Sequence, residues 1–204
     1  MFTGIVREVG TVAASERSKG LVRLTVSAPR TAARVQRLES VAVNGVCLTV
    51  VDVRHGALVF EAIRETARVT TVGRWRSGSR VHLEPSLSLS DPLGGHLLFG
   101  HVDGIGMVVK RLSGAGGLTL ELAVSPRLRR FLVPKGPVAV DGISLTVGRI
   151  PGASAVAIHL IPETIRQTTL GSRVVGDRVN VEIDYLAKLT WQYLNGRVGR
   201  DRRG

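Results

Sequence analysis

Short runs in which apolar and polar residues alternate occupy the first half of the chain, and turn-forming residues separate them. Because successive side chains of a strand point to opposite faces, this alternation predicts β-strands that are buried on one side. Val, Leu, Ile and Thr dominate the runs, as is typical of strands. The predicted strands are, in order, 3–16, 20–28, 40–45, 46–53, 57–63 and 80–87.

The second half of the chain repeats the first. Gly4 and Val6 match Gly100 and Val102, and three longer blocks recur farther along in the same order. Blocks in one order at a nearly constant spacing indicate two copies of one folding unit. The blocks, with seven of ten, seven of eleven and four of seven positions identical, are VAVNGVCLTV (41–50) with VAVDGISLTV (138–147), IRETARVTTVG (63–73) with IPETIRQTTLG (161–171), and GSRVHLE (78–84) with GDRVNVE (176–182).

Each copy is expected to form a small antiparallel barrel of about six strands. The pairs Asn44-Gly45 and Asp141-Gly142 stand between strand-like runs, and such pairs favour the type I′ turns of tight hairpins. The predicted fold class is therefore all-β, with two tandem similar six-stranded barrels that arose by internal duplication. The predicted parts are a first domain over 1–88, a second over 97–184, a linker within 85–96, and short helices within 29–39 and 125–135.

A helix is predicted after the second copy, in the segment 185–204. Leu186, Leu189, Tyr193 and Leu194 recur at helical spacing, and the pair Asn195-Gly196 is a stop signal. An amphipathic helix outside both barrels needs an apolar partner. That partner is either the chain's own barrels or the same helix in other subunits, and we favour the second. The segment closes with a basic tail.

Composition excludes several classes of protein. The longest apolar runs are far shorter than a membrane span, and the N-terminus lacks the pattern of a signal peptide. One cysteine permits no internal disulfide, which fits a reducing cytoplasm. The formal net charge of +12 raises the possibility of a polyanion partner. The arginines are scattered, however, and no basic and aromatic platform accompanies them, so nucleic-acid binding is disfavoured.

Candidate chemistry comes from the strand that follows each hairpin and from the differences between the copies. Cys47 and Thr49 in the first copy, and Ser144 and Thr146 in the second, should share an outer face or rim opposite the apolar residues. Cys47 becomes Ser144 and, elsewhere, Ile5 becomes His101, Ser86 becomes Asp184 and Asn44 becomes Asp141. The second half thus collects His101, Ser144 and Asp184, which are suited to proton transfer and polarisation.

Other chemistries are weakly supported. A hydrolase triad of His101, Ser144 and Asp184 lacks a nucleophile elbow. His96 and His101 have no further metal ligand at a suitable spacing, so no metal site is predicted. The run GHVDGIG (100–106) resembles a phosphate-binding loop only superficially. Three histidines remain: His55 and His82 are expected at the surface or a rim, and His159 could be a surface residue or border a pocket.

At this point the motifs MFTGIV (1–6), NGVCLTV, DGISLTV, GGHLLFGHVDGIG (94–106) and HLIPETIRQTTL (159–170) together resemble the α-chain type of riboflavin synthase, over about residues 1–190. The resemblance implies two six-stranded Greek-key barrels, a C-terminal helix and a homotrimer assembled through that helix. It implies the dismutation of two 6,7-dimethyl-8-ribityllumazine molecules into riboflavin and 5-amino-6-ribitylamino-pyrimidinedione, with no metal, flavin or nicotinamide cofactor. It also implies lumazine synthase as a further partner.

The family's site residues carry over to the matching positions of this sequence. The positions most often implicated in the chemistry match Phe2, Cys47, His101, Ser144 and Asp184. As a hypothesis, Ser144 and His101 activate the nucleophile or shuttle the proton, Asp184 supports them across a subunit interface, and Cys47 marks the opposite site. The substrate contacts would be Gly4, Ile5, Val6, Cys47, Leu48, Thr49, Glu61, Ala62, Ile63, Arg64, Glu65 and Thr66 in the N-terminal site, and Gly100, His101, Val102, Lys135, Ser144, Leu145, Thr146, His159, Leu160, Ile161, Pro162, Glu163 and Thr164 in the C-terminal site.

A second interpretation belongs to another class of protein. A non-catalytic lumazine- or flavin-binding protein of the same fold would need only one of the two sites. It could lose the polar groups of the other. Because His101, Lys135, Ser144, Thr146 and Asp184 are all present in the second half, the sequence favours the enzyme.

Overall fold

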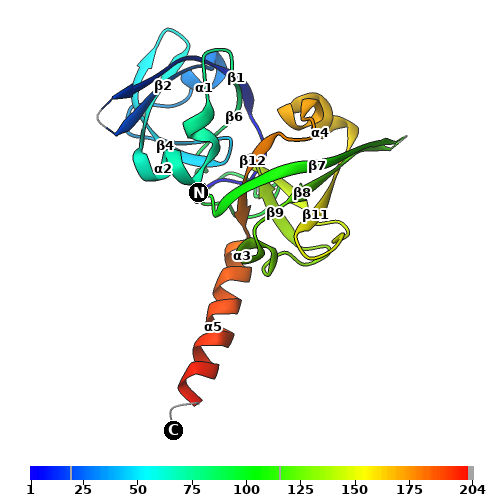
Figure 1. Ribbon diagram of the computed structural model, residues 1–204. Coiled ribbons are helices and arrows are strands. Elements are labelled where there is room, and N and C mark those ends of the chain that lie inside the picture. The colour runs from blue at the N-terminus through cyan, green and yellow to red at the C-terminus, as the bar shows by residue number, and fades with distance from the viewer. Residues whose placement is uncertain (19, 115, 202–204) are drawn as a thin grey trace.

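The computed structural model of the chain describes residues 1–18, 20–114 and 116–201, and of 197–201 it describes the backbone alone. Two β-sheet units lie side by side, and one long helix projects away from them (Figure 1). The chain starts near the centre of the molecule, between the two units, and the C-terminus lies at the far end of the helix (Figure 1). The last three residues of the predicted basic tail, 202–204, lie outside the described residues.

The first unit is a closed, antiparallel six-stranded barrel, as predicted. Its strands follow the order β1-β2-β5-β4-β3-β6 around the barrel. The first strand starts later than predicted, because residues 3–6 leave the barrel as a loop, and pairing begins where the N–H of Arg7 donates to the carbonyl of Leu83 at 3.0 Å. The strands are β1 (Glu8–Ser18), β2 (Leu21–Ser27), β3 (Ser40–Val43), β4 (Val46–Arg54), β5 (Ala57–Ile63) and β6 (Arg80–Pro85).

The second unit repeats this architecture in six strands with the order β10-β9-β12-β7-β8-β11. The two ends of the sheet are joined by one isolated bridge between Val147 and Ile158 and by two backbone hydrogen bonds of Ala157, with Gly148 and Arg149. The second unit is therefore closed more loosely than the first, across the gap between β10 and β11. The strands are β7 (Gly104–Gly114), β8 (Gly117–Ala123), β9 (Pro137–Val140), β10 (Ile143–Thr146), β11 (Ala155–Leu160) and β12 (Arg178–Ile183).

Short helices close the barrels at corresponding places. The two predicted ones are single turns, α1 (Pro29–Ala32) and α3 (Pro126–Arg129). Two others, α2 (Arg64–Val69) and α4 (Pro162–Gln167), were not predicted, and α2 begins directly after the segment 57–63 that was expected to be a strand. An acidic residue in the first turn favours a helix there, as does the proline of α4 at a position where it loses no hydrogen bond. A 3₁₀ turn follows each, Thr71–Arg74 and Thr169–Ser172.

The C-terminal helix α5 (Tyr185–Asp201) continues through Asn195-Gly196, where the sequence had predicted its end. A glycine inside a helix costs only about 1 kcal/mol, which the surrounding turns can absorb. The near end of the helix is anchored to the second barrel, where the ring of Trp191 packs edge-on against Phe131 and the Arg130 guanidinium lies over Trp191 at 4.1 Å. Within the described residues, no helix is long and apolar enough to cross a membrane.

The two barrels meet around a pseudo-twofold arrangement. Phe2 and Leu98, which precede equivalent loops, exchange two backbone hydrogen bonds of 2.8 and 3.0 Å. The hairpin turns 44–45 and 141–142 pack against each other, glycine to glycine. Phe2 is fully buried in a small apolar cluster at this contact, together with Ala42, Leu98 and Ala139.

His82 lies in this interface, which corrects the expectation that it sits at the surface. It is 2% exposed, and its Nδ1 donates to the carbonyl of Asp141 at 2.9 Å. Its Nε2 accepts from the backbone N–H of Thr169, also at 2.9 Å. Burial lowers the pKa of His82 from 6.5 to about 4. The ring is therefore a neutral, barrel-to-barrel hydrogen-bonding group at neutral pH. His55, by contrast, is exposed as predicted.

Candidate functional site

The outer face of the first barrel carries the polar pair predicted from the sequence. In β4, Val46, Leu48 and Val50 are buried, whereas Cys47 is half-buried and Thr49 is exposed. In the neighbouring strand β5, Glu61 and Ile63 are exposed. Strand alternation therefore displays one small polar face across two adjacent strands, as predicted.

The second barrel presents the equivalent face. Ser144 is half-buried and Thr146 is exposed on β10. His159 is exposed on β11, where its Nδ1 lies 2.9 Å from the hydroxyl of Thr119 on β8. At the corresponding place in the first barrel, Arg23 and Glu61 form an ion pair instead. The two faces are therefore built from equivalent strands but carry different charged and polar side chains.

The loops that border these faces are exchanged between the barrels. The carbonyl of Gly4 accepts from the N–H of Ser144 at 2.9 Å, and Val6 packs against the second core. The carbonyl of Gly100 accepts from the N–H of Cys47, also at 2.9 Å, and Val102 packs against the first core. Residues 4–6 and 100–102, which were expected to serve the sites of their own barrels, lie instead against the opposite barrels.

Gly4 and Gly100 are required by this crossing. Both have a positive φ, +78° and +72°. A Cβ on Gly4 would lie 2.6 Å from the Cβ of Ser144, and one on Gly100 would lie 2.6 Å from the Cβ of Cys47. A side chain at either position would therefore be strained by its backbone conformation and would push the loop off the opposite strand.

Ser144 has a partner that the sequence analysis did not assign to it. The Oγ of Ser144 lies 2.7 Å from Nδ1 of His96, and Gly95 packs directly on the serine side chain. Burial lowers the pKa of His96, and the negative charge of Asp184 partly opposes this shift. A neutral imidazole in this position can take the hydroxyl proton of Ser144. From the sequence, His96 was considered only as a metal ligand, and that role was rejected.

His101 lies at the other face. It follows Gly100, whose loop rests on Cys47, and its exposed ring stacks on Phe99 with centroids 6.0 Å apart. Within one chain, Ser144 therefore pairs with His96 and not with His101, contrary to the simplest form of the sequence hypothesis. Asp184 lies between β12 and α5. Its side chain accepts a 3.3 Å hydrogen bond from the N–H of Leu186, at the start of α5.

Several other predicted site residues cannot offer their side chains to a ligand on the outer face. Phe2 is fully buried between the barrels, and Leu48, Ala62 and Leu160 point into the barrel cores. Such positions can contribute only backbone atoms or packing. The remaining predicted contacts are half-buried or exposed: Ile5, Arg64, Glu65, Thr66, Lys135, Leu145, Ile161, Pro162, Glu163 and Thr164. Within the described residues, no cluster of His, Cys, Asp and Glu is suited to hold a metal ion.

Comparison with known proteins agrees with this duplicated architecture. The family model described as the lumazine binding domain matches twice, over residues 3–86 and 99–184. The riboflavin synthase of Mycobacterium bovis is 42% identical over 191 residues, which cover 92% of this chain and 95% of that protein. The chain belongs to the riboflavin synthase family. The riboflavin synthases of Brucella abortus and Bacillus subtilis are 40% and 33% identical, over 92% and 96% of this chain and 95% and 90% of their own lengths.

Solved structures share the fold of this riboflavin synthase family member. LumP complexed with riboflavin superposes with a TM-score of 0.84 at 23% identity, and the match covers 90% of this chain and all of that one. LumP complexed with 6,7-dimethyl-8-(1'-D-ribityl) lumazine gives 0.82, over 90% and 99% of the two chains at the same identity. At this level of identity the likeness establishes the fold alone.

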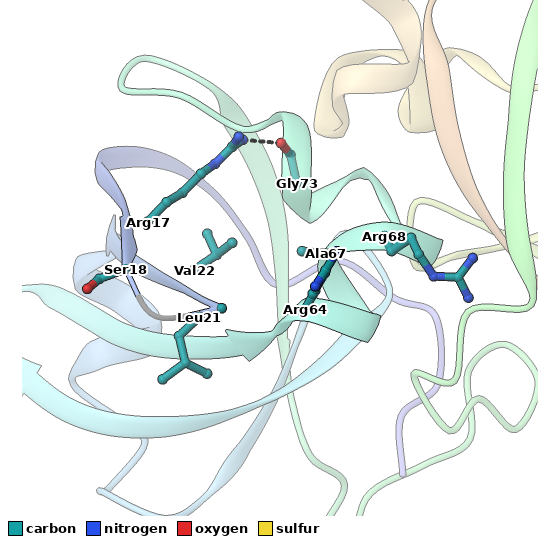
Figure 2. Close-up of a pocket in the computed structure, with 9 residues that line it drawn as sticks. Arg17, Ser18, Leu21, Val22, Arg64, Ala67, Arg68 and Gly73 are labelled. Carbon is teal, nitrogen blue, oxygen red and sulfur yellow. Dashed lines mark hydrogen bonds between the residues drawn. The ribbon is translucent and has the colours of Figure 1, made fainter.

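A cavity of about 560 Å³ lies elsewhere, between the β1–β2 hairpin and α2. Figure 2 shows Arg17 reaching from the hairpin to the carbonyl of Gly73, while Arg68 points away from Arg17. Arg64 is the one residue of the family-derived site set that lines this cavity. Strand β5 lies between the cavity and β4, which carries Cys47 and Thr49, so the cavity borders the candidate site only at Arg64.

Proposed function

We propose that the chain is a riboflavin synthase that converts two molecules of 6,7-dimethyl-8-ribityllumazine into riboflavin and 5-amino-6-ribitylamino-pyrimidinedione by transfer of a four-carbon unit. The observation that best supports this proposal is the pair of equivalent outer faces, which bear different polar groups. One face has Cys47 and the His101 loop, and the other has the Ser144–His96 pair. Two like faces suit two like substrates, and their differences assign a donor and an acceptor role.

The polar groups of the second face supply proton transfer. Neutral His96 accepts the proton of Ser144, and Asp184 stabilises the imidazolium that forms, because its charge favours the protonated ring. The activated Ser144 then acts on the substrate, whose acidic C7 methyl group must lose a proton in the reaction. Thr49 and Thr146, equivalent and exposed, bind the two substrates alike. Backbone groups of 61–64 and 159–162 bind the pteridine edges.

The complete site joins two chains. Ser144 and His101 belong to different faces of one chain, so we propose that the first face of one chain meets the second face of its neighbour. There the two substrates stack, His101 joins Ser144, and Asp184 acts near the interface. Holding both substrates in a reactive geometry lowers the barrier substantially, since it replaces a bimolecular encounter.

A binding protein is the second candidate. LumP, which shares the fold, forms complexes with riboflavin and with the lumazine. The Ser144–His96 pair favours the enzyme, because a pure binder has no use for a proton acceptor beside a serine.

The assay that separates the two candidates follows riboflavin absorbance after mixing the purified chain with 6,7-dimethyl-8-ribityllumazine. We expect one riboflavin for every two substrate molecules consumed, at a rate well above that without protein. Tight binding of the lumazine without turnover would establish the binding protein instead.

Helix α5 is the proposed contact through which chains form a homotrimer. Leu186, Leu189 and Leu194 are 69%, 46% and 57% exposed in the single chain and are spread over a broad arc of the helix. Exposed apolar side chains on a projecting helix gain free energy when another copy covers them. The Trp191 side faces Phe131 of the same chain, so the two sides of the helix have separate partners.

Introducing a charge on that face should dissociate the assembly and abolish activity. We expect Leu189→Glu to shift the protein from a trimer to a monomer in analytical ultracentrifugation, with riboflavin formation reduced at least tenfold. Asn195→Glu, on the opposite side of the helix, is the matched control and should leave both unchanged. An active monomer would show that the site lies within a single chain.

A further inference from the structure

Two buried glutamates occupy equivalent positions at the ends of the last strand of each barrel. Glu84 on β6 and Glu182 on β12 are each 5% exposed. Glu84 pairs in register with Ala42, and Glu182 pairs with Ala139. Neither has a role in the proposed chemistry. A carboxylate this deeply buried needs hydrogen-bond donors, and its donors show what it holds.

The donors of Glu84 are the start of the chain. Its Oε1 accepts from the N–H and from the hydroxyl of Thr3, both at 2.7 Å, and its Oε2 accepts from the N–H of Gly4 at 2.9 Å. The hydroxyl of Thr3 in turn accepts from the N–H of Ile5 at 3.1 Å. One carboxylate therefore holds Thr3 and Gly4 directly and Ile5 through the hydroxyl of Thr3.

Glu182 holds the equivalent loop of the second half. Its two oxygens accept from the N–H groups of Phe99, at 2.8 Å, and Gly100, at 3.1 Å. A further backbone bond from His101 favours its charged form, while burial raises its pKa, as burial does for Glu84. Both carboxylates thus sit at the base of a loop and accept from its backbone.

Because each loop reaches across to the other barrel, the loop that each glutamate holds contacts the outer face of the opposite barrel. The loop held by Glu84 ends on Ser144, and the loop held by Glu182 ends on Cys47. We propose that Glu84 and Glu182 are positioning residues that act in the opposite barrel: Glu84 sets the loop over Ser144, and Glu182 sets Gly100 and His101 against Cys47.

Both oxygens of each carboxylate are needed for this role. A glutamine in place of either glutamate keeps one acceptor and turns an amide N–H₂ toward backbone N–H groups that require an acceptor. A buried donor without a partner destabilises the closed loop, whereas the strand that carries the residue keeps its ladder bonds to its neighbours. The loop should therefore open more often while the barrel persists.

The single cysteine of the chain reports on one of the two loops. Cys47 is half-buried, and Gly100 lies directly on it. We expect Glu182→Gln to raise the rate of Cys47 alkylation by iodoacetamide about tenfold or more under native conditions. Glu84→Gln, the matched control, lies in the same barrel as Cys47 and should change that rate less than about twofold.

The reciprocal experiment uses the background Cys47→Ser with Ser144→Cys, which moves the thiol to the other face. There Glu84→Gln should raise the alkylation rate about tenfold and Glu182→Gln should not. Glu84→Asp and Glu182→Asp repeat both comparisons should a glutamine variant fail to fold, because they keep the charge and shorten the reach.

Equal effects of both variants on either thiol would overturn the proposal, since they indicate general loosening. Effects confined to the thiol of the same barrel, or no effect at all, would overturn it as well. The proposal gains its functional meaning from the proposed synthase activity, but alkylation requires no turnover. If the chain forms no riboflavin but each glutamine variant exposes the thiol of the opposite barrel, the positioning role of the glutamates stands and the proposed synthase function fails.

Discussion

Replacing His96 with glutamine is expected to lower kcat for riboflavin formation by about 10²–10⁴-fold. Glutamine fills a similar space and can still bond to Ser144, but it cannot take up a proton. The structure places His96 Nδ1 2.7 Å from the serine oxygen and lowers its pKa by burial, so the ring is neutral and ready to accept. Steady-state kinetics with 6,7-dimethyl-8-ribityllumazine measure the effect.

Four companion variants show which residues cause the loss of kcat. Ser144→Ala should reduce kcat to a similar degree, and the double variant should be little worse than either, because the two residues act as one unit. His55→Gln is the control, since His55 is exposed in the β4–β5 turn. Normal turnover in His96→Gln, with a loss only in His101→Gln, would assign proton transfer to His101 and leave His96 a structural role.

Acid should weaken the chain through His82, and His82→Asn should remove that part of the effect. The pKa of His82 is about 4 in the folded chain and 6.5 for the free group, so the unfolded chain binds the extra proton between these values. The stability that depends on neutral His82 is complete above pH 6.5 and is lost as the pH falls toward 4. The loss is about 2 kcal/mol by pH 5 and approaches about 3 kcal/mol at pH 4.

The second copy of the repeat shows why asparagine is a suitable replacement for His82. Asn180 occupies the equivalent place, where its amide donates to the carbonyl of Asn44 and accepts from the N–H of Thr71. An asparagine at position 82 should bond in the same way and has no proton to gain. Urea unfolding at several pH values and one protein concentration gives the free energy of unfolding of both proteins.

The difference between the free energies of unfolding of the parent and of His82→Asn, taken at each pH, isolates the contribution of His82. Burial raises the pKa of Asp141, Glu84 and Glu182, so these groups weaken the folded chain as the pH rises through their folded pKa values, the opposite direction. They are present in both proteins and cancel. An unchanged pH dependence in His82→Asn would show that the histidine is protonated in place.

The exchange of loops explains why the site was only partly predictable. The repeats aligned Gly4 with Gly100 and Cys47 with Ser144 correctly. In the structure Gly4 contacts Ser144, and Gly100 contacts Cys47. The alignment could not show that each glycine rests on the other copy's strand. Sequence neighbours were the natural grouping, whereas the docking of the two barrels decides which loop reaches which face.

His96 and His82 were misjudged for a related reason. A lone histidine in a sequence has no visible partner, and its burial depends on elements far along the chain. His96 meets Ser144 from 48 positions away, and His82 meets Thr169 from 87 positions away. The helices α2 and α4 were missed because each has only six residues, too few for a helical period to stand out in the sequence.

The sequence by itself determined the duplication, the strand content, the face of each strand that is buried, and the family. These follow from local alternation, turn residues and self-similarity, which need no knowledge of distant contacts. Only the tertiary structure decided the crossed loops, the Ser144–His96 pair, the neutral histidine between the barrels and the apolar side of α5 left uncovered. Each of these depends on how two similar barrels dock around a pseudo-twofold, and residues that meet across such a contact are remote from one another in the chain.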